Sequence, residues 1–255
     1  MPLEIVTIPC LSDNYAFLAH DAASGETALI DIPEAGPILS ELGARGWTLS
    51  HVLITHHHWD HIDGLADVLA AHPAKVVGAA ADAHRLPPLD LAVAEGDTLT
   101  IGGEPVAVFD VSGHTVGHIA YYMPASSAVF TADSLMALGC GRLFEGTAPQ
   151  MWESLGKLAA LPADTIVYSG HEYTQSNGNF AVTVDPGNPD LAARVQDIAR
   201  ARAENRPTVP SALQLELATN PFLRAENADI QAHLGMTGAT PAEVFAEIRA
   251  RKDKF

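Results

Sequence analysis

Cysteine and positive charge are scarce in this sequence of 255 residues. The two cysteines, Cys10 and Cys140, are too few for the disulfide framework of a small secreted protein. The 14 lysine and arginine residues stand against 31 aspartate and glutamate residues, which gives a formal net charge of −17. Because such a charge repels polyphosphate and anionic lipid, we expect neither nucleic acid nor a membrane as a partner.

Long apolar runs and a targeting signal are also lacking. No uncharged apolar run reaches the roughly 18 residues that a membrane-spanning helix needs. The first residues, Met-Pro-Leu-Glu, lack the basic and apolar regions of a secretion signal. With 47% hydrophobic and 18% charged residues, the composition is typical of a compact globular protein. We therefore expect a cytoplasmic monomer.

The pattern of the chain changes near residue 172. Before it, short β-branched runs alternate with glycine, proline and aspartate, which predicts strands with a few helices between them. After it the pattern is helical, with Asn188, Ser211 and Thr240 as predicted N-caps. We predict a layered α/β domain over 1–172 and a smaller helical domain over 173–255. The predicted strands are 5–9, 15–20, 27–31, 51–55, 76–79, 98–101, 106–111, 119–123, 128–131 and 165–168, and the predicted helices before residue 172 are 37–45, 64–71 and 150–161.

Histidine is abundant, and four of the 12 histidines fall within residues 55–61, Thr-His-His-His-Trp-Asp-His. This stretch follows the apolar run Val52-Leu53-Ile54 directly. Alternate residues of an extended loop point the same way, so His56, His58 and Asp60 converge, and the next turn brings in His61. Imidazole and carboxylate suit zinc, iron or manganese. The alternative is a polar surface loop or the remnant of an affinity tag. A tag is terminal and uniform, whereas this stretch is internal and is interrupted by Trp59 and Asp60.

Three later segments repeat one design, in which a β-like run and a small residue precede a potential ligand: His114, Asp133 or His171. Together with the first cluster they supply seven ligands, which is too many for one four-coordinate ion. On geometric grounds we expect these seven ligands to be divided between two ions that share one water molecule. The first ion takes His56, His58 and His114, the second takes Asp60, His61 and His171, and Asp133 bridges both. His57 is expected to be a supporting residue, and His118 to orient a ligand or a loop.

The order of these motifs resembles the metallo-β-lactamase superfamily, and longer stretches are similar to the glyoxalase II (hydroxyacylglutathione hydrolase) family. Those stretches are residues 55–61, Gly-His-Thr-Val-Gly-His at 113–118, Gly-Cys-Gly-Arg-Leu-Phe-Glu-Gly at 139–146, Gly-His-Glu-Tyr-Thr at 170–174 and Asn-Pro-Phe-Leu-Arg at 220–224. The similarity continues through residues 249–255. The resemblance implies a four-layer α/β/β/α sandwich as the catalytic domain, with a dinuclear site at its edge, followed by an α-helical substrate-binding domain.

The resemblance also implies an activity, the hydrolysis of S-D-lactoylglutathione and other S-2-hydroxyacylglutathiones to a 2-hydroxy acid and glutathione, in methylglyoxal detoxification. We expect a hydroxide held between two divalent ions, Zn²⁺ first with iron or manganese as alternatives, to attack the thioester. Asp60 and Asp133 are then the catalytic carboxylates. The implied substrate contacts are Arg142, Phe144, Tyr173, Arg249 and Lys252, and Phe144 replaces a tyrosine found in some members.

The positions of the cations support this assignment of substrate contacts. Arg142 is the only lysine or arginine between Arg85 and Lys157, and four of the 14 cations lie in the last seven residues. An anionic tripeptide needs such groups, although cations at a helix end also complement the helix dipole. Two alternatives stay open: another hydrolase of the same fold, acting on a lactone or a different thioester, and a non-catalytic metal-binding protein.

Overall fold

The computed structural model describes residues 2–255, so residue 1, with which the predicted catalytic domain begins, lies outside the described residues. The chain forms two compact units. The first comprises the chain up to Asp110 together with Val116–Phe130, and the second comprises Val111–Thr115 together with Thr131–Phe255. The functional division after residue 172 stays a prediction.

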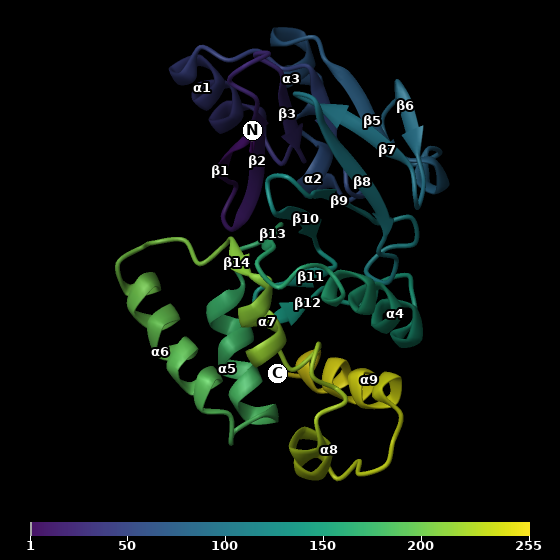
Figure 1. The fold of residues 1–255 in the computed structure, drawn as a ribbon, viewed down its shortest axis with the longest axis vertical. Coiled ribbons are helices and arrows are strands. Elements are labelled where there is room, and N and C mark those ends of the chain that lie inside the picture. The colour runs from purple at the N-terminus through teal and green to yellow at the C-terminus, as the bar shows by residue number, and fades with distance from the viewer. Residues whose placement is uncertain (1) are drawn as a thin grey trace. The chain divides into compact units, whose positions relative to one another are not determined.

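A six-stranded sheet of order β1-β2-β3-β4-β5-β6 belongs to the first unit (Figure 1). The first three strands are antiparallel, whereas β3 to β6 run parallel. Because parallel strands end at the same edge, the segments that follow β3 and β4 start side by side. The strands are β1 (Glu4–Cys10), β2 (Asn14–His20), β3 (Thr27–Ile30), β4 (His51–Leu53), β5 (Lys75–Ala79) and β6 (Leu91–Val93).

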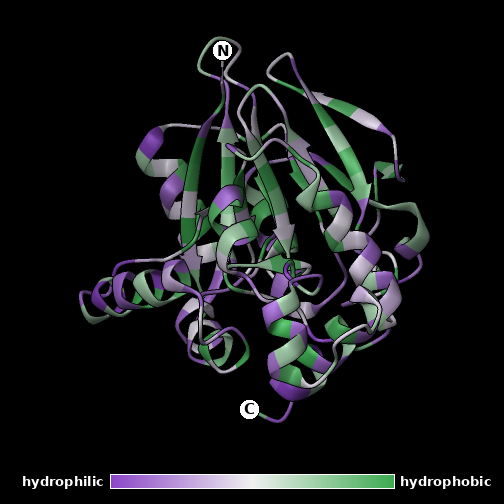
Figure 2. Cartoon of the chain, turned by 60° about the horizontal axis from the view of Figure 1, so that its bottom comes forward, coloured by the Kyte–Doolittle hydropathy of each residue, from purple (hydrophilic) through white to green (hydrophobic). Residues whose placement is uncertain are grey.

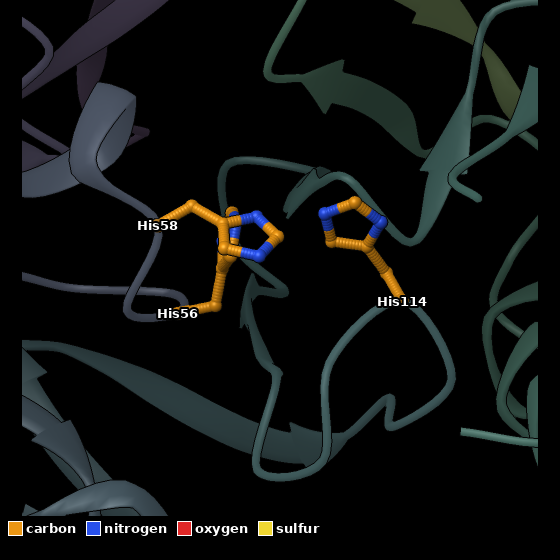
Figure 3. Close-up of side chains that lie close together, drawn as sticks. All are labelled: His56, His58 and His114. Carbon is orange, nitrogen blue, oxygen red and sulfur yellow. The ribbon is translucent and has the colours of Figure 1, made fainter. Parts of the chain in front are cut away.

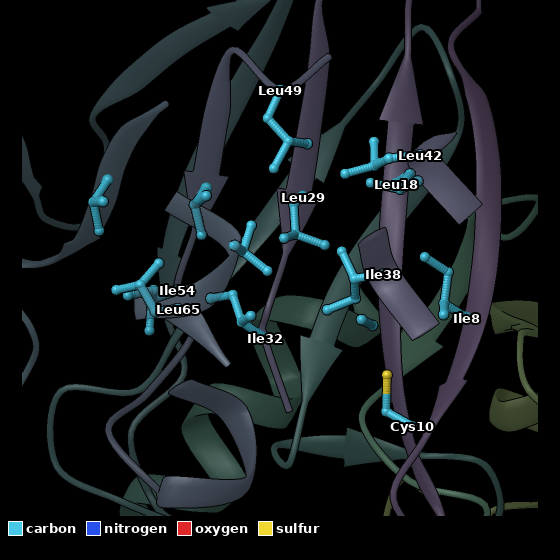
Figure 4. Close-up of a cluster of buried hydrophobic side chains, with 14 of the residues drawn as sticks. Ile8, Cys10, Leu18, Leu29, Ile32, Ile38, Leu42, Leu49, Ile54 and Leu65 are labelled. Atoms are coloured by element: carbon cyan, nitrogen blue, oxygen red, sulfur yellow. The ribbon is translucent and has the colours of Figure 1, made fainter. Parts of the chain in front are cut away.

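A hydrophobic core joins this sheet to helices α1 (Ala35–Arg45) and α3 (Leu65–Ala71) (Figure 4). Leu18, Leu29, Ile38, Leu42 and Val68 are all at 0% exposure. Burying an aliphatic side chain of this size contributes about 1.5–3 kcal/mol, so the cluster holds β4 firmly in place. Two short helical turns, α2 (Trp59–Ile62) and η1 (Ala80–Asp82), complete the helices of this unit.

Four antiparallel strands of a second sheet also fall largely in the first unit: β7 (Thr98–Ile101), β8 (Glu104–Asp110), β9 (Ile119–Met123) and β10 (Ala128–Ala132). The order of this sheet is β14-β13-β10-β9-β8-β7. Phe130 on β10 packs on Phe17 of β2 with ring centroids 5.6 Å apart. The hydroxyl of Tyr121 donates to the carbonyl of Ile54 at 2.9 Å. The segment after β4 is therefore also held by the second sheet.

The second unit is mainly helical and is built around short strands. Helices α5 and α6 pack through a small core that contains Leu138, Ala181, Leu191 and Ile198 (Figure 1). Asn188 caps α6, and Thr240 forms a capping box with Glu243 at the start of α9, as predicted. The elements are β11 (Leu135–Met136), β12 (Gly139–Cys140), α4 (Ala148–Ala159), β13 (Ile166–Ser169), α5 (Thr174–Val184), α6 (Pro189–Ala203), β14 (Ser211–Ala212), α7 (Leu213–Thr219), α8 (Ala228–Leu234) and α9 (Pro241–Lys252).

Hydropathy explains why most elements were predictable. The strands are mainly hydrophobic, whereas the helices alternate hydrophobic and hydrophilic residues (Figure 2). The ten predicted strands and the helices at 37–45, 64–71 and 150–161 are present within about two residues. Within residues 2–255, no helix combines the length and apolar character needed to cross a bilayer.

One predicted cap was wrong, and several elements were not predicted. Ser211 lies in β14 and its hydroxyl donates to Glu216 at 2.7 Å, while Ala212 occupies the N-cap of α7. A buried carboxylate attracts this serine more strongly than the local helix end does. The elements not predicted are β6, β11, β12, β14, η1, α2, α5 and α8, which are short or, in α5, interrupted by glycine and β-branched residues.

Candidate metal and substrate site

Asp31 organises the loop that carries the histidine cluster. It follows β3 directly, in the left-handed region at φ 55°, and its carboxylate accepts from both the backbone N–H and the hydroxyl of Thr55, at 2.9 and 2.8 Å. The same carboxylate lies 2.8 Å from Nδ1 of His61. A proton on Nδ1 satisfies this contact and leaves the Nε2 lone pair as the ligand atom. Asp31 was not singled out from the sequence, although an aspartate that ends a strand before such a cluster is a usable signal.

His56 and His58 point their ring nitrogens at one another. Nε2 of His56 lies 3.1 Å from Nδ1 of His58, and the other nitrogen of His56 lies 3.0 Å from the hydroxyl oxygen of Thr55. Because that hydroxyl donates to Asp31, its oxygen accepts from Nδ1–H of His56. The chemistry of this donor pair suits a cation, which can accept both facing lone pairs. Figure 3 draws both rings, and it also draws His114 of the second unit.

A compact histidine and aspartate cluster is therefore present within the first unit. Asp31, His56 and His61 each offer one ligand atom, and these three atoms lie within 4.8 Å of one another. All three side chains are buried. Buried groups of this kind are typical of metal sites, so the cluster bears out a metal-binding character for the protein.

Asp60 lies in the first turn of α2 and is held by Asn14, a residue that the sequence reasoning missed. The side-chain amide of Asn14 donates to the backbone carbonyl and to Oδ2 of Asp60, both at 3.1 Å. Asn14 is buried at the start of β2. Nothing in the local sequence pairs Asn14 with Asp60, because 46 positions separate them.

The two remaining histidines of this region have supporting contacts. Nδ1 of His57 lies 3.0 Å from the buried carboxylate of Asp82, which also accepts from Arg85 at 2.6 Å. The ring of His118 stacks on that of His56, with centroids 4.6 Å apart and an interplanar angle of 12°. That His57 is a supporting residue, and that His118 orients a ligand or a loop, stays a prediction for which these contacts offer a physical basis.

The second unit contains His114, Asp133 and His171, all buried. Oδ2 of Asp133 lies 3.4 Å from Nε2 of His114 and 3.3 Å from Nε2 of His171. Nδ1 of His114 donates to the backbone carbonyl of Arg142 at 2.8 Å, since a carbonyl can only accept. That bond leaves Nε2 of His114 as its ligand atom. One carboxylate oxygen thus lies close to two imidazole nitrogens, and the bridging role of Asp133 stays a prediction.

Glycine is required at position 141 beside these ligands. A Cβ there would lie 2.0 Å from the carbonyl oxygen of Asp133 and 2.9 Å from Nδ1 of His114. Any side chain would displace one of the two groups. The sequence pattern Gly-Cys-Gly-Arg did not reveal this requirement, which depends on the close approach of the two loops.

Aromatic side chains lie against the ligands of the second unit. The ring of Tyr173 stacks on that of His171 with centroids 4.7 Å apart and an interplanar angle of 7°. Phe144 lies 5.2 Å from the ring of His114 and is 62% exposed. Two of the predicted substrate contacts therefore adjoin predicted metal ligands.

The predicted cationic contacts interact with one another. Burial, together with the charges of Arg249 and Arg142, lowers the pKa of Lys252 below its ordinary value. The ammonium of Lys252 donates to the hydroxyl and the carbonyl of Ser176 at 3.2 and 3.3 Å. The side chain of Arg142 is exposed. Three of the 14 cations of the chain thus lie close enough to act on one another within the second unit.

Arg249 lies in the interior of the second unit at 5% exposure. Its guanidinium donates to the carbonyl of Cys140 at 2.8 Å and to Asp253 at 2.8 and 3.1 Å. These bonds hold the end of β12, one residue before Gly141 and two before Arg142. A direct contact of Arg249 with glutathione stays a prediction, whereas its hold on the backbone of this loop is a feature of the structure.

Burial disfavours the reactive thiolate form of both cysteines. Burial raises the pKa of Cys10 and that of Cys140 to about 11 each. Both thiols therefore stay protonated at neutral pH, and the thiolate is the reactive form.

Comparisons with known proteins show the family of the chain. Residues 20–171 match the family model of the metallo-β-lactamase superfamily, and residues 172–255 match the model of the hydroxyacylglutathione hydrolase C-terminus. The chain is 69% identical over 255 residues to a protein of Ruegeria pomeroyi named hydroxyacylglutathione hydrolase, with 100% of each chain covered.

Two solved structures share the fold at 26% identity. ETHE1 from Myxococcus xanthus superposes with a TM-score of 0.69, covering 98% of this chain and 90% of the other. TTHA1623 in a di-iron-bound form superposes with a TM-score of 0.60, covering 86% of this chain and 100% of the other. These matches confirm the predicted fold class, a metallo-β-lactamase fold with a C-terminal helical region. The chain belongs to the hydroxyacylglutathione hydrolase family of the metallo-β-lactamase superfamily.

Proposed function

We propose that this chain hydrolyses the thioester bond of S-D-lactoylglutathione and related S-2-hydroxyacylglutathiones, releasing a 2-hydroxy acid and glutathione. The observation that carries the proposal is the stacking of Tyr173 on His171, because it places a predicted glutathione contact against a predicted metal ligand. The name of the full-length relative supports the same substrate class.

We propose that seven residues hold two divalent cations, with Asp133 common to both. The position of Asp133 Oδ2 between the Nε2 atoms of two histidines supports this role. The di-iron-bound relative supports the number of ions. We propose Zn²⁺ as the resident metal, with iron or manganese able to replace it, because imidazole and carboxylate ligands suit all three. The seven residues, all within the 20–171 match, are His56, His58, Asp60, His61, His114, Asp133 and His171.

Such a pair of ions, when bound, supplies Lewis-acid and water-activating chemistry. The residues of the chain prepare the ligands for it. Asp31 and the carbonyl of Arg142 each hold a histidine Nδ1–H, so that Nε2 of His61 and of His114 presents a lone pair. Asn14 orients the carboxylate of Asp60, which serves as the proton acceptor in this proposal.

The departure of the leaving group requires little help from the protein. A thiol has a reference pKa of about 8.5, so the glutathione thiolate leaves without a strong general acid. Recognition must then come from the tripeptide. We propose that Arg142 and Lys252 bind its carboxylates and that Tyr173 contributes a hydrogen bond. Arg249 either contacts the tripeptide itself or acts by holding the carbonyl of Cys140.

The proposal predicts hydrolysis of S-D-lactoylglutathione by the purified holoprotein, loss of that activity with a chelator, and recovery on adding back metal. Metal analysis of the same sample gives the number of ions per chain. A small thioester that lacks the tripeptide is the matched control substrate and should react poorly. Equal turnover of both thioesters, or turnover only of a lactone, would instead favour another hydrolase of this fold. Metal binding without any turnover would favour a non-catalytic protein.

We also propose that the chain acts as a cytoplasmic monomer in the detoxification of methylglyoxal. The two cysteines and the net charge of −17 support a reducing compartment and a soluble particle. Sedimentation of the purified protein tests the oligomeric state, and methylglyoxal sensitivity of cells that lack the protein tests the role.

A further inference from the structure

The ammonium of Lys252 lies over two adjacent aromatic rings. Its ammonium nitrogen is 5.4 Å from the ring centroid of Phe180 and 5.2 Å from that of Phe255. The two rings pack edge to face, with centroids 5.5 Å apart at an angle of 66°. Both distances fall within the range of attractive cation–π contacts.

The two rings differ in how firmly they are held. Phe180 on α5 is 2% exposed and packs on Phe222 with centroids 6.1 Å apart. Phe255 is 64% exposed, and its ring meets only Phe180 and Lys252 among the ring contacts found within residues 2–255. Phe180 is thus part of the core, whereas the ring of Phe255 is held in place by its contacts with Phe180 and Lys252.

The two rings favour the charged form of Lys252, which its arginine neighbours disfavour. The charges of Arg142 and Arg249 act against its protonated form, and among the nearby acidic groups only Asp253 is found to act in its favour. The negative faces of two rings attract the ammonium without neutralising it. An acidic partner would hold the ammonium equally well but would compete with an anionic ligand.

We propose that Phe255 is a positioning residue that, with Phe180, holds the ammonium of Lys252 toward a carboxylate of the glutathione moiety. The proposal rests on the proposed function, because it takes Lys252 as a glutathione contact. Phe255 does not reach the reacting atoms, so it acts on substrate affinity and leaves the chemical step unchanged. By contrast, a merely structural role would require only its apolar bulk.

Phe255→Leu separates these two roles, since leucine keeps the bulk and lacks the ring. We expect this variant to raise KM for S-D-lactoylglutathione and Kd for S-methylglutathione about three- to tenfold, within the range expected of a cation–π contact. The kcat and the metal content should stay at the wild-type level. Phe255→Trp should restore both constants, and Phe109→Leu in the first unit is the control for loss of an aromatic residue elsewhere.

A double-mutant cycle with Lys252→Met tests whether the effect passes through the lysine. In the Lys252→Met protein, Phe255→Leu should change Kd for S-methylglutathione by less than about twofold. Wild-type affinity in Phe255→Leu, or an equal loss in both backgrounds, would overturn the proposal.

A spectroscopic readout keeps the inference distinct from the proposed function. The ε-methylene protons of Lys252 should show an upfield ring-current shift in the wild-type protein that Phe255→Leu loses. If the shift is present and S-methylglutathione does not bind, the proposed function fails, whereas the ring contact stands. If glutathione thioesters are hydrolysed and the shift is absent, the positioning role of Phe255 is wrong.

Discussion

The side-chain amide of Asn14 donates to both the backbone carbonyl and the carboxylate of Asp60, at 3.1 Å each. Hydrogen bonds to metal ligands fix their orientation, and losing one typically lowers metal affinity about 10- to 100-fold. We expect Asn14→Ala to lower the affinity for one of the two ions by this amount. Competition with a chelator, followed by metal analysis, measures the change.

Ser12→Ala is the control for the Asn14 variant, because Ser12 is exposed in the same turn between β1 and β2. It should retain wild-type metal affinity. If Asn14→Ala also retains it, the hydrogen bonds to Asp60 have no part in metal binding.

Asp133 is expected to determine metal content and activity together. Its Oδ2 lies between two histidine Nε2 atoms, so Asp133→Ala removes a ligand that both ions share in the proposal. His57→Gln should have much less effect, because His57 contacts Asp82. Elemental analysis and thioester turnover of both variants decide the matter, and an Asp133→Ala protein with two ions per chain and full turnover would remove the dinuclear proposal.

Arg249 and Lys252 should differ in their effects on stability. Arg249→Ala leaves the buried carbonyl of Cys140 without this donor, which should lower the free energy of unfolding by about 1–3 kcal/mol. Lys252→Ala should lower it by less, since Lys252 is only half-buried and water can replace its ammonium at Ser176. Denaturant unfolding compares the two variants, and equal stabilities would show that the bond to Cys140 is unimportant.

The Arg249→Ala and Lys252→Ala double variant should lower kcat/KM for S-D-lactoylglutathione at least about tenfold, because charge-assisted contacts contribute roughly 1.5–3 kcal/mol each. Metal content should stay unchanged. A wild-type kcat/KM would mean that the cations of α9 have no role in glutathione recognition.

The affinity for an anionic ligand should depend on alkaline pH through Lys252. Burial and the charges of Arg249 and Arg142 lower the pKa of Lys252 from 10.5, so its ammonium loses its proton at a lower pH than an exposed lysine does. Binding of S-methylglutathione should therefore weaken as the pH rises through this lowered pKa. Lys252→Arg should remove that dependence, because arginine stays charged in this range. Identical calorimetric profiles for the two proteins would contradict the prediction.

The same lowered pKa sets the sign of the effect on stability. Between the pKa of Lys252 in the folded protein and 10.5, the unfolded chain binds more protons than the folded one. The contribution of Lys252 to the free energy of unfolding therefore increases as the pH rises through that window, whereas the affinity for an anionic ligand decreases. Comparison of unfolding and binding over the same pH range separates the two effects.

The sequence alone predicts most elements of the fold and the residue types that we propose as metal ligands. Strands such as β4 and the helices α6 and α9 follow from hydropathy, proline and capping residues, which act over a few positions. The cluster at 55–61 is equally local. Its spacing in a loop after a buried strand implies a metal site before any tertiary contact is considered.

Tertiary structure alone decided which residues support that site. Asn14 meets Asp60 across 46 positions, and Arg249 meets Cys140 across 109. No local pattern encodes these pairs, because they form when separate elements pack and buried polar groups find their partners. For the same reason Ser211 joins Glu216 in the interior and leaves the helix end to Ala212. The sequence therefore determines which donor atoms are present. Packing decides how they are oriented, which nitrogen of a histidine ring carries the proton, and that the side chain of Arg249 points into the interior of the second unit.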